Sequence, residues 1–235
     1  MTGEPVVEMR GVVKSHNTLR PLRIAELTIA TGARVALSGI DAAGAEVMLN
    51  LVTGASLPDE GEVRVFGRST AAVSDGDEWL ASLDRFGIVS ERAVLLEGAT
   101  LTQNLALPFA LEIDPVPAET IARVEALADE CGIGREHLSG RAGDVPAAVR
   151  LRVHFARAIA LGPQLLLMEH PTAALAESER RAFGSIVGRV CDARGITMLA
   201  VTQDLAFASA AAHEALSLNA ATGRLSRDRR SWWRR

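Results

Sequence analysis

Apolar and polar positions along the chain follow two periods, and each period predicts one kind of element. Short runs that are apolar throughout or alternate with polar residues, bounded by turn residues, are typical of strands and cover 6–13, 22–32, 34–39, 58–67, 164–170 and 196–204. Apolar residues three and four positions apart are typical of helices and cover 45–54, 100–111, 117–134, 147–162 and 177–195. Strands that alternate with helices predict an α/β fold built on a parallel sheet.

Length, composition and charge narrow the class of protein. With 235 residues, 48% of them hydrophobic, the chain is long enough to bury a core without disulfides or metals. The formal net charge of −4 and the pI near 5.8 argue against a nucleic-acid partner. Cys131 and Cys191 lie far apart in the sequence, which favours buried thiols over a disulfide framework or a zinc site. The start does not resemble a signal peptide and no long apolar span occurs, so we expect a cytoplasmic protein.

The organisation along the chain indicates one main unit and a short tail. We expect residues 1–225 to form a single domain, with a helical part at about 90–155. The tail, 226–235, is rich in arginine and contains Trp232 and Trp233. Such side chains suit a membrane interface or a partner groove, and disorder is the alternative for so short an end.

Four segments occur in an order that resembles one protein family. They are LVTGASLPDEGEVRVFG, TLTQNLALPF, RVHFARAIALGPQLLLMEHPTAAL and LAVTQDLAFA. Together they resemble the nucleotide-binding subunits of ATP-binding cassette (ABC) transporters, from about residue 6 to residue 220. The resemblance implies a P-loop NTPase-like core with a parallel sheet, an antiparallel β subdomain and a helical subdomain. It also implies ATP and Mg²⁺ as cofactors, a transmembrane permease as partner, and a head-to-tail dimer.

The family's phosphate-binding loop, G-x-x-x-x-G-K-[ST], is altered in this chain. In that motif loop amides hold phosphate, the lysine reaches the outer phosphates and the hydroxyl binds Mg²⁺. The corresponding residues are Gly39, Asp41, Gly44, Ala45, Glu46 and Val47. Ala45 stands at the lysine position and Glu46 at the hydroxyl position, and Lys14 is the only lysine in the chain. We therefore expect weak or no ATP binding. We expect Gly39 and Gly44 only to provide the turn that connects the strand to the helix.

The segments that carry the family's catalytic and signature residues are altered as well. Glu169 stands where the family has the aspartate that holds Mg²⁺, and His170 stands where it has the glutamate that activates water. A glutamate can hold a hydrated metal and a neutral imidazole can accept a proton, but both need a positioned nucleotide. A structural histidine at a strand end is the alternative. The signature serine and glycines correspond to Pro146, Ala147 and Ala148, and the proline removes a hydroxyl and an amide donor.

Four further single positions also differ from the family's residues. Gln203 stands at the position of the family's switch histidine, and His16 at that of the aromatic that stacks on adenine. Glu91 replaces a glutamine that senses the γ-phosphate and contacts the membrane partner, and Ala176 replaces the aspartate after the catalytic strand. In the family the region from about 91 to 107 forms part of the groove that receives the permease. The residues that match the family are therefore mainly those that its fold and its docking on a permease need, and not those that bind and hydrolyse ATP.

Three hypotheses about function remain. The first is a noncatalytic cassette subunit on the inner face of the membrane, docked on a permease as a homodimer or with an intact cassette. The second is an active but atypical ATPase that uses Glu169, His170 and Gln203 to energise transport, such as export or lipid or lipoprotein extraction. The third is a soluble scaffold without a membrane partner.

Overall fold

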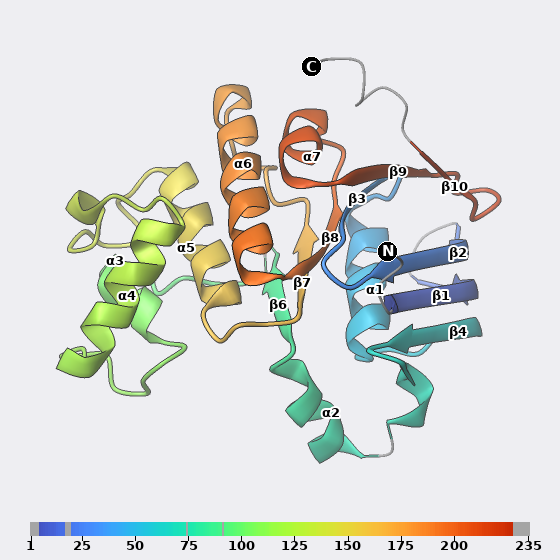
Figure 1. Cartoon of the computed structure of the whole chain (residues 1–235), viewed down its shortest axis with the longest axis horizontal. Helices are drawn as coiled ribbons and strands as arrows, with labels where there is room; N and C mark the ends of the chain where they lie inside the picture. Colours follow the sequence, from blue (N-terminus) through green and yellow to red (C-terminus); the bar gives the residue numbers. More distant parts are fainter. Residues whose placement is uncertain (1–4, 17–19, 74, 91, 228–235) are drawn as a thin grey trace.

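Two sheets organise the protein (Figure 1), whose computed structural model describes residues 5–16, 20–73, 75–90 and 92–227. A four-stranded antiparallel sheet has the order β2-β1-β4-β5, and a six-stranded sheet has the order β10-β9-β3-β8-β7-β6. In the second sheet β9, β3, β8, β7 and β6 run parallel, and β10 pairs antiparallel with β9. The strands are β1 (Pro5–Lys14), β2 (Leu22–Ala30), β3 (Arg34–Ser38), β4 (Glu60–Val65), β5 (Arg68–Ser69), β6 (Phe86–Val89), β7 (Leu165–Glu169), β8 (Thr197–Val201), β9 (Glu214–Leu218) and β10 (Leu225–Arg227).

Helices flank the central sheet and form a separate group at one end. The described α-helices are α1 (Ala42–Thr53), α2 (Gly76–Leu83), α3 (Leu101–Ala106), α4 (Ala118–Glu130), α5 (Ala147–Ile159), α6 (Glu177–Arg194) and α7 (Leu205–Ala211). Figure 1 shows α3, α4 and α5 gathered beyond α6, whereas α1 lies between the central and the antiparallel strands. The α/β fold class, with a parallel sheet, an antiparallel sheet and added helices, is confirmed.

Strand β7 separates the two hydrophobic cores. Leu166 and Met168 belong to the core beneath α5, α6 and α7, whereas Leu165 and Leu167 belong to the core around α1 and the antiparallel sheet. Both faces of the strand are therefore buried, as its continuous apolar run predicts. The strand ends at Glu169, so its first polar side chain emerges at the carboxyl edge of the sheet, where open α/β sheets bind ligands.

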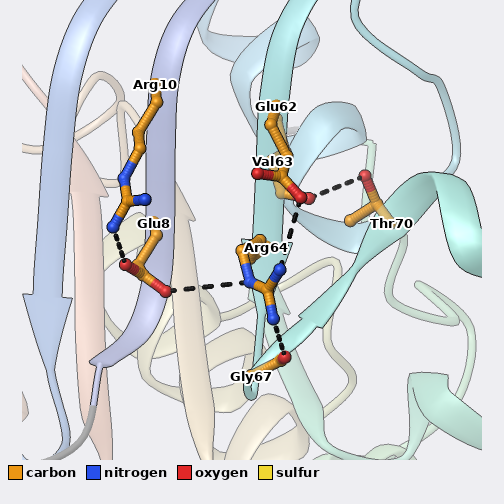
Figure 2. A network of polar contacts seen from close by, with 7 residues as sticks. All are labelled: Glu8, Arg10, Glu62, Val63, Arg64, Gly67 and Thr70. Atoms are coloured by element: carbon orange, nitrogen blue, oxygen red, sulfur yellow. Dashed lines mark hydrogen bonds and ion pairs between the residues drawn. The ribbon is translucent and has the colours of Figure 1, made fainter.

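The antiparallel sheet has one buried and one solvated face. Val63 and Val65 of β4 point into the core with Met9 of β1. On the other face (Figure 2), the Arg64 guanidinium donates to the Gly67 carbonyl at 2.7 Å and pairs with Glu62 at 3.4 Å. Exposed ion pairs of this kind contribute about 0–1 kcal/mol each. The burial of the apolar face, and not this polar network, therefore holds the sheet to α1.

The ends of several helices are set by local chemistry. Thr100 caps α3 and exchanges hydrogen bonds with Gln103 in a capping box, whereas the helix ends at Ala106, earlier than the apolar pattern to 111 predicts. Pro108 follows closely, and proline cannot continue the hydrogen-bond pattern of a helix. The short elements α2, β6, α7, β9 and β10 were not predicted from the sequence.

Other sequence expectations have mixed outcomes. Cys131 and Cys191 are buried free thiols, as expected. Trp232 and Trp233 lie outside the described residues, so the role of the tail stays a prediction. Within the described residues, no helix combines the length and the apolar character that crossing a membrane requires.

Candidate functional site: the loop between β3 and α1

The loop after β3 is shaped by two glycines that packing requires. Gly39 has a φ of 86°, and a Cβ at this position would lie 2.4 Å from the carbonyl oxygen of Leu218. A Cβ at Gly44 would lie 2.8 Å from the Ile40 Cγ2 atom. Both distances are shorter than real Cβ contacts, and the positive φ of Gly39 favours glycine as well, so packing and backbone conformation account for these two glycines without a bound phosphate.

The start of α1 is capped from within the loop. Asp41 is the N-cap residue, and its Oδ1 atom accepts a hydrogen bond from the Gly44 amide at 2.8 Å. The Ala45 amide donates to the Asp41 carbonyl, also at 2.8 Å, and the Ala45 side chain is fully buried. A negatively charged side chain thus occupies one amide at the helix N-terminus, where a phosphate loop would offer its amides to an anion.

Three charged side chains from three elements meet beside this loop. Glu46 comes from the first turns of α1, Glu169 from the end of β7, and Arg92 from the segment after β6. The Arg92 Nη2 atom donates to Glu169 Oε2 at 3.1 Å, and its Nη1 atom donates to Glu46 Oε1. Glu169 is the most buried of the three, with 13% of its side chain exposed, whereas Glu46 and Arg92 are about half exposed. One guanidinium therefore bridges two carboxylates.

The environment of Glu169 favours its neutral form. Burial raises the pKa of the Glu169 carboxyl above its ordinary value, and the negative charge of Glu46 acts in the same direction. The Arg92 guanidinium opposes both effects through its charge and its hydrogen bond. Without Arg92 the two carboxylates would face each other with less compensation.

His170 follows β7 in a strained backbone conformation. Its φ is 40°, its amide donates to the Val201 carbonyl at 2.8 Å, and its ring Nε2 atom is buried with no hydrogen-bond partner among the described residues. A cavity of about 290 Å³ adjoins the ring. Its polar lining side chains are Ser90, Arg150, His154, Glu169 and His170. Burial and the neighbouring charges of Arg157 and Arg150 lower the pKa of His154.

A second cavity brings together other residues that the sequence singles out. It has a volume of about 320 Å³ and joins His16 to Gly39, Asp41 and Gly44 of the loop. Gln203, which follows β8, donates through Nε2 to the Ile40 carbonyl at 3.1 Å and so contacts the same loop. These residues come from distant parts of the sequence, yet they surround one side of the loop.

The residues at the start of α5 differ in their relation to the two cavities. Pro146 is the N-cap of α5, is exposed and lines neither cavity. Ala148 is partly buried and also lines neither cavity. Ala147 lines the cavity beside His170. Glu91 lies outside the described residues, so its contacts stay a prediction. Ala176 precedes α6 as its N-cap residue without a side-chain hydrogen bond.

Comparison with known proteins identifies the family. The family model described as ABC transporter matches residues 22–173. This chain belongs to the ABC transporter family. It is 30% identical over 87% of its length to "Methionine import ATP-binding protein MetN" of Brucella abortus. It is 31% identical over 98% of its length to "Macrolide export ATP-binding/permease protein MacB 1/2" of Paracoccus denitrificans.

The share of the matched protein that this chain covers differs from one match to the next. The chain spans 54% of the Brucella relative and 34% of the Paracoccus relative. Among solved structures, a dimeric bacterial ABC transporter cassette has a TM-score of 0.76 at 22% identity, with 94% of this chain and 98% of that chain covered. A nucleotide-free ATP-binding cassette has a TM-score of 0.76 at 16% identity, with coverage of 97% and 93%. These structures show the fold, which is that of an ABC ATPase cassette.

Proteins of the ABC family bind ATP, so the residues at the corresponding positions can be tested against ATP and Mg²⁺. A magnesium ion needs oxygen ligands at about 2.0–2.1 Å in octahedral geometry. The two carboxylates that would face the metal, Glu46 and Glu169, are both engaged by the Arg92 guanidinium. On the phosphate side, Ala45 supplies no cation and Asp41 supplies a negative charge. The residues as they lie do not fit a magnesium triphosphate.

Sequence reasoning missed Arg92 and the cavity beside His170. Arg92 directly follows the Glu91 position, and its positive charge next to a position that differs from the family was a usable signal. The cavity depends on how the start of α5 approaches the end of β7, which is tertiary packing that the local patterns of the two elements do not show.

Proposed function

We propose that this chain is a noncatalytic ABC cassette subunit that docks on a transmembrane permease at the cytoplasmic face of the membrane. It forms a head-to-tail dimer with a second copy or with an intact cassette, and it binds ATP weakly or not at all. The substrate and the direction of transport are those of the permease. Its relatives include proteins named for import and for export.

The phosphate loop carries this proposal. Phosphoryl transfer depends mainly on positioning and on positive charge around the phosphates. Ala45 is fully buried at the position where the family has lysine, and the Asp41 carboxylate takes the amide of Gly44. Each lost charge-assisted hydrogen bond removes about 1.5–3 kcal/mol, and the carboxylate adds repulsion. Glu169, His170 and Gln203 then have no positioned triphosphate on which to act.

An exposed apolar surface after β6 supports docking. Val94 and Leu96 expose 72% and 47% of their surface in the region where the family resemblance places the permease groove. Their backbone is nevertheless fixed, because Arg157 of α5 donates to the Val94 carbonyl at 2.9 Å. Asn104 of α3 is fully buried, and it donates to the Leu96 carbonyl at 3.0 Å and accepts from the Leu96 amide at 2.9 Å. Apolar side chains on a rigid backbone suit a protein partner.

Equilibrium binding of ATP to the purified chain tests the proposal, with and without Mg²⁺ and with an intact ABC cassette as control. We expect dissociation constants in the millimolar range or no binding, and no release of phosphate above the buffer background. Micromolar, Mg²⁺-dependent binding would refute the noncatalytic assignment. In that case loss of hydrolysis in His170→Ala would identify an atypical ATPase.

A second experiment tests docking. The chain is co-expressed with the ABC permeases of its source, and the fraction recovered with the membranes is measured. Val94→Asp should lower this fraction, whereas Leu161→Asp is a matched control because Leu161 is likewise exposed, at 60%, but lies just after α5. No recovery with any permease would favour a soluble scaffold, and equal recovery of wild type and Val94→Asp would show that Val94 is not part of the docking surface.

A further inference from the structure

The two arms of Arg92 address two different carboxylates. The distance from Nη2 to Glu169 Oε2 is 3.1 Å, and Nη1 donates to Glu46 Oε1. The planar guanidinium has donors in a fixed fork, so one side chain can satisfy two oxygens that diverge. Its positive charge does not depend on pH in the physiological range, because the guanidinium is not deprotonated in proteins.

The three side chains are anchored to different parts of the fold. Glu46 belongs to α1, Glu169 closes β7, and Arg92 lies on the segment that β6 leads into. Two residues after Arg92, the Val94 carbonyl is held by Arg157 of α5. The segment is therefore connected to the central sheet on one side and to the helical group on the other.

We infer that Arg92 is a built-in cation that replaces the divalent metal in this cleft and excludes it. The two carboxylates that would hold a metal already share one guanidinium that belongs to the chain. Any ligand that enters the cleft then binds without a metal, and the segment after β6 is fixed without a ligand. This inference rests on the proposed function in that both treat the cleft as altered, but it makes a separate claim about the metal alone.

Binding of Mn²⁺, measured by electron paramagnetic resonance of the free ion in the absence of nucleotide, tests this claim. We compare wild type with Arg92→Gln, which leaves Glu46 and Glu169 without their common partner. We expect no saturable binding to wild type up to millimolar Mn²⁺, and binding to Arg92→Gln at least tenfold tighter. Arg135→Gln is a matched control, because Arg135 is also an exposed arginine in ion pairs, with Asp129 and Glu125.

Two further variants show whether the position and the charge matter. In Arg92→Gln combined with Glu169→Gln, the gained binding should be lost. Arg92→Lys keeps the charge but not the two-armed fork, so its Mn²⁺ binding should lie between that of wild type and that of Arg92→Gln, and it provides the comparison with wild type if Arg92→Gln does not fold. Specific binding of Mn²⁺ to wild type, equal binding to wild type and Arg92→Gln, or binding to a folded Arg92→Lys variant as tight as to Arg92→Gln would overturn the inference.

The experiment separates the two proposals. Micromolar binding of ATP to wild type that needs no metal would refute the weak or absent ATP binding of the proposed function and leave the Arg92 inference standing. Binding of Mn²⁺ to wild type without any affinity for ATP would refute the Arg92 inference and leave the proposed function standing. Amide hydrogen exchange tests the claim that Arg92 fixes the segment after β6. The amides of residues 93–96 should exchange faster in Arg92→Gln than in wild type, and an unchanged rate would contradict this claim.

Discussion

Gly39→Ala tests whether the glycine of the phosphate loop serves packing alone. The substitution places a methyl group 2.4 Å from the Leu218 carbonyl oxygen at a residue whose φ is 86°. The positive φ costs about 1–2 kcal/mol, and the less flexible unfolded chain returns about 0.4–1 kcal/mol. Pushing a methyl group into packed backbone adds about 1–3 kcal/mol. We expect a net loss of about 2–4 kcal/mol in the free energy of unfolding.

Gly162→Ala is a matched control for the backbone part of this effect. Gly162 has a φ of 70°, and a Cβ there would meet nothing within 4 Å. Its substitution should therefore cost only the backbone strain, about 1 kcal/mol. The assay is urea unfolding of both variants and of wild type without nucleotide. Equal shifts of the two midpoints would refute the reasoning, because they would mean that β9 does not press against Gly39 and that packing does not explain this glycine.

Three other predictions concern single groups. Ala45→Lys combined with Glu46→Ser should tighten ATP binding at least tenfold, because one charge-assisted contact contributes about 1.5–3 kcal/mol; unchanged affinity in calorimetry would contradict the account of the loop. The pKa of Glu169 is raised above 4.5 in the folded state, so the folded state loses stability when this carboxyl ionises. The free energy of unfolding in urea should therefore fall for wild type relative to Glu169→Gln as the pH rises from about 4 to about 7, and a relative increase would contradict this. Burial raises the pKa of Cys131 and Cys191 to about 12, so neither thiol should react with a thiol reagent at about pH 8 until the chain is unfolded, and rapid native labelling would contradict their burial.

Most of the framework could be predicted from the sequence because it depends on local patterns. The apolar run of β7 predicts a strand buried on both faces, and the threonines at 100 and 102 predict a helix start, which the structure places at Thr100. Helical spacing was less reliable for individual side chains. Ile121 shares the spacing of Val124 and Leu127, yet it is 40% exposed while they are buried. The width of the apolar stripe that a helix buries depends on its tertiary neighbours, which spacing alone does not give.

The candidate site was predicted only in part, because its residues meet through the fold. The position-by-position resemblance located Glu46 and Glu169, but it gave no sign that they share a partner. That partner, Arg92, is 46 residues from Glu46 and 77 from Glu169. Its role depends on a parallel sheet that places the ends of β6 and β7 next to each other. Short strands such as β6 carry too little periodicity to be detected from a single sequence.

The charges of the cleft argue that its alterations form one system. Loss of the lysine at Ala45 alone would leave a phosphate loop with unused amides, but the Asp41 carboxylate occupies the Gly44 amide. A glutamate at position 46 alone would repel Glu169, but Arg92 binds both. Two of the changes that weaken nucleotide or metal binding in the proposed function, Asp41 and Glu46, thus have internal partners, whereas the buried Nε2 atom of His170 has none among the described residues. The loop and the two carboxylates therefore need no ligand to remain in place, which suits a stable support for docking.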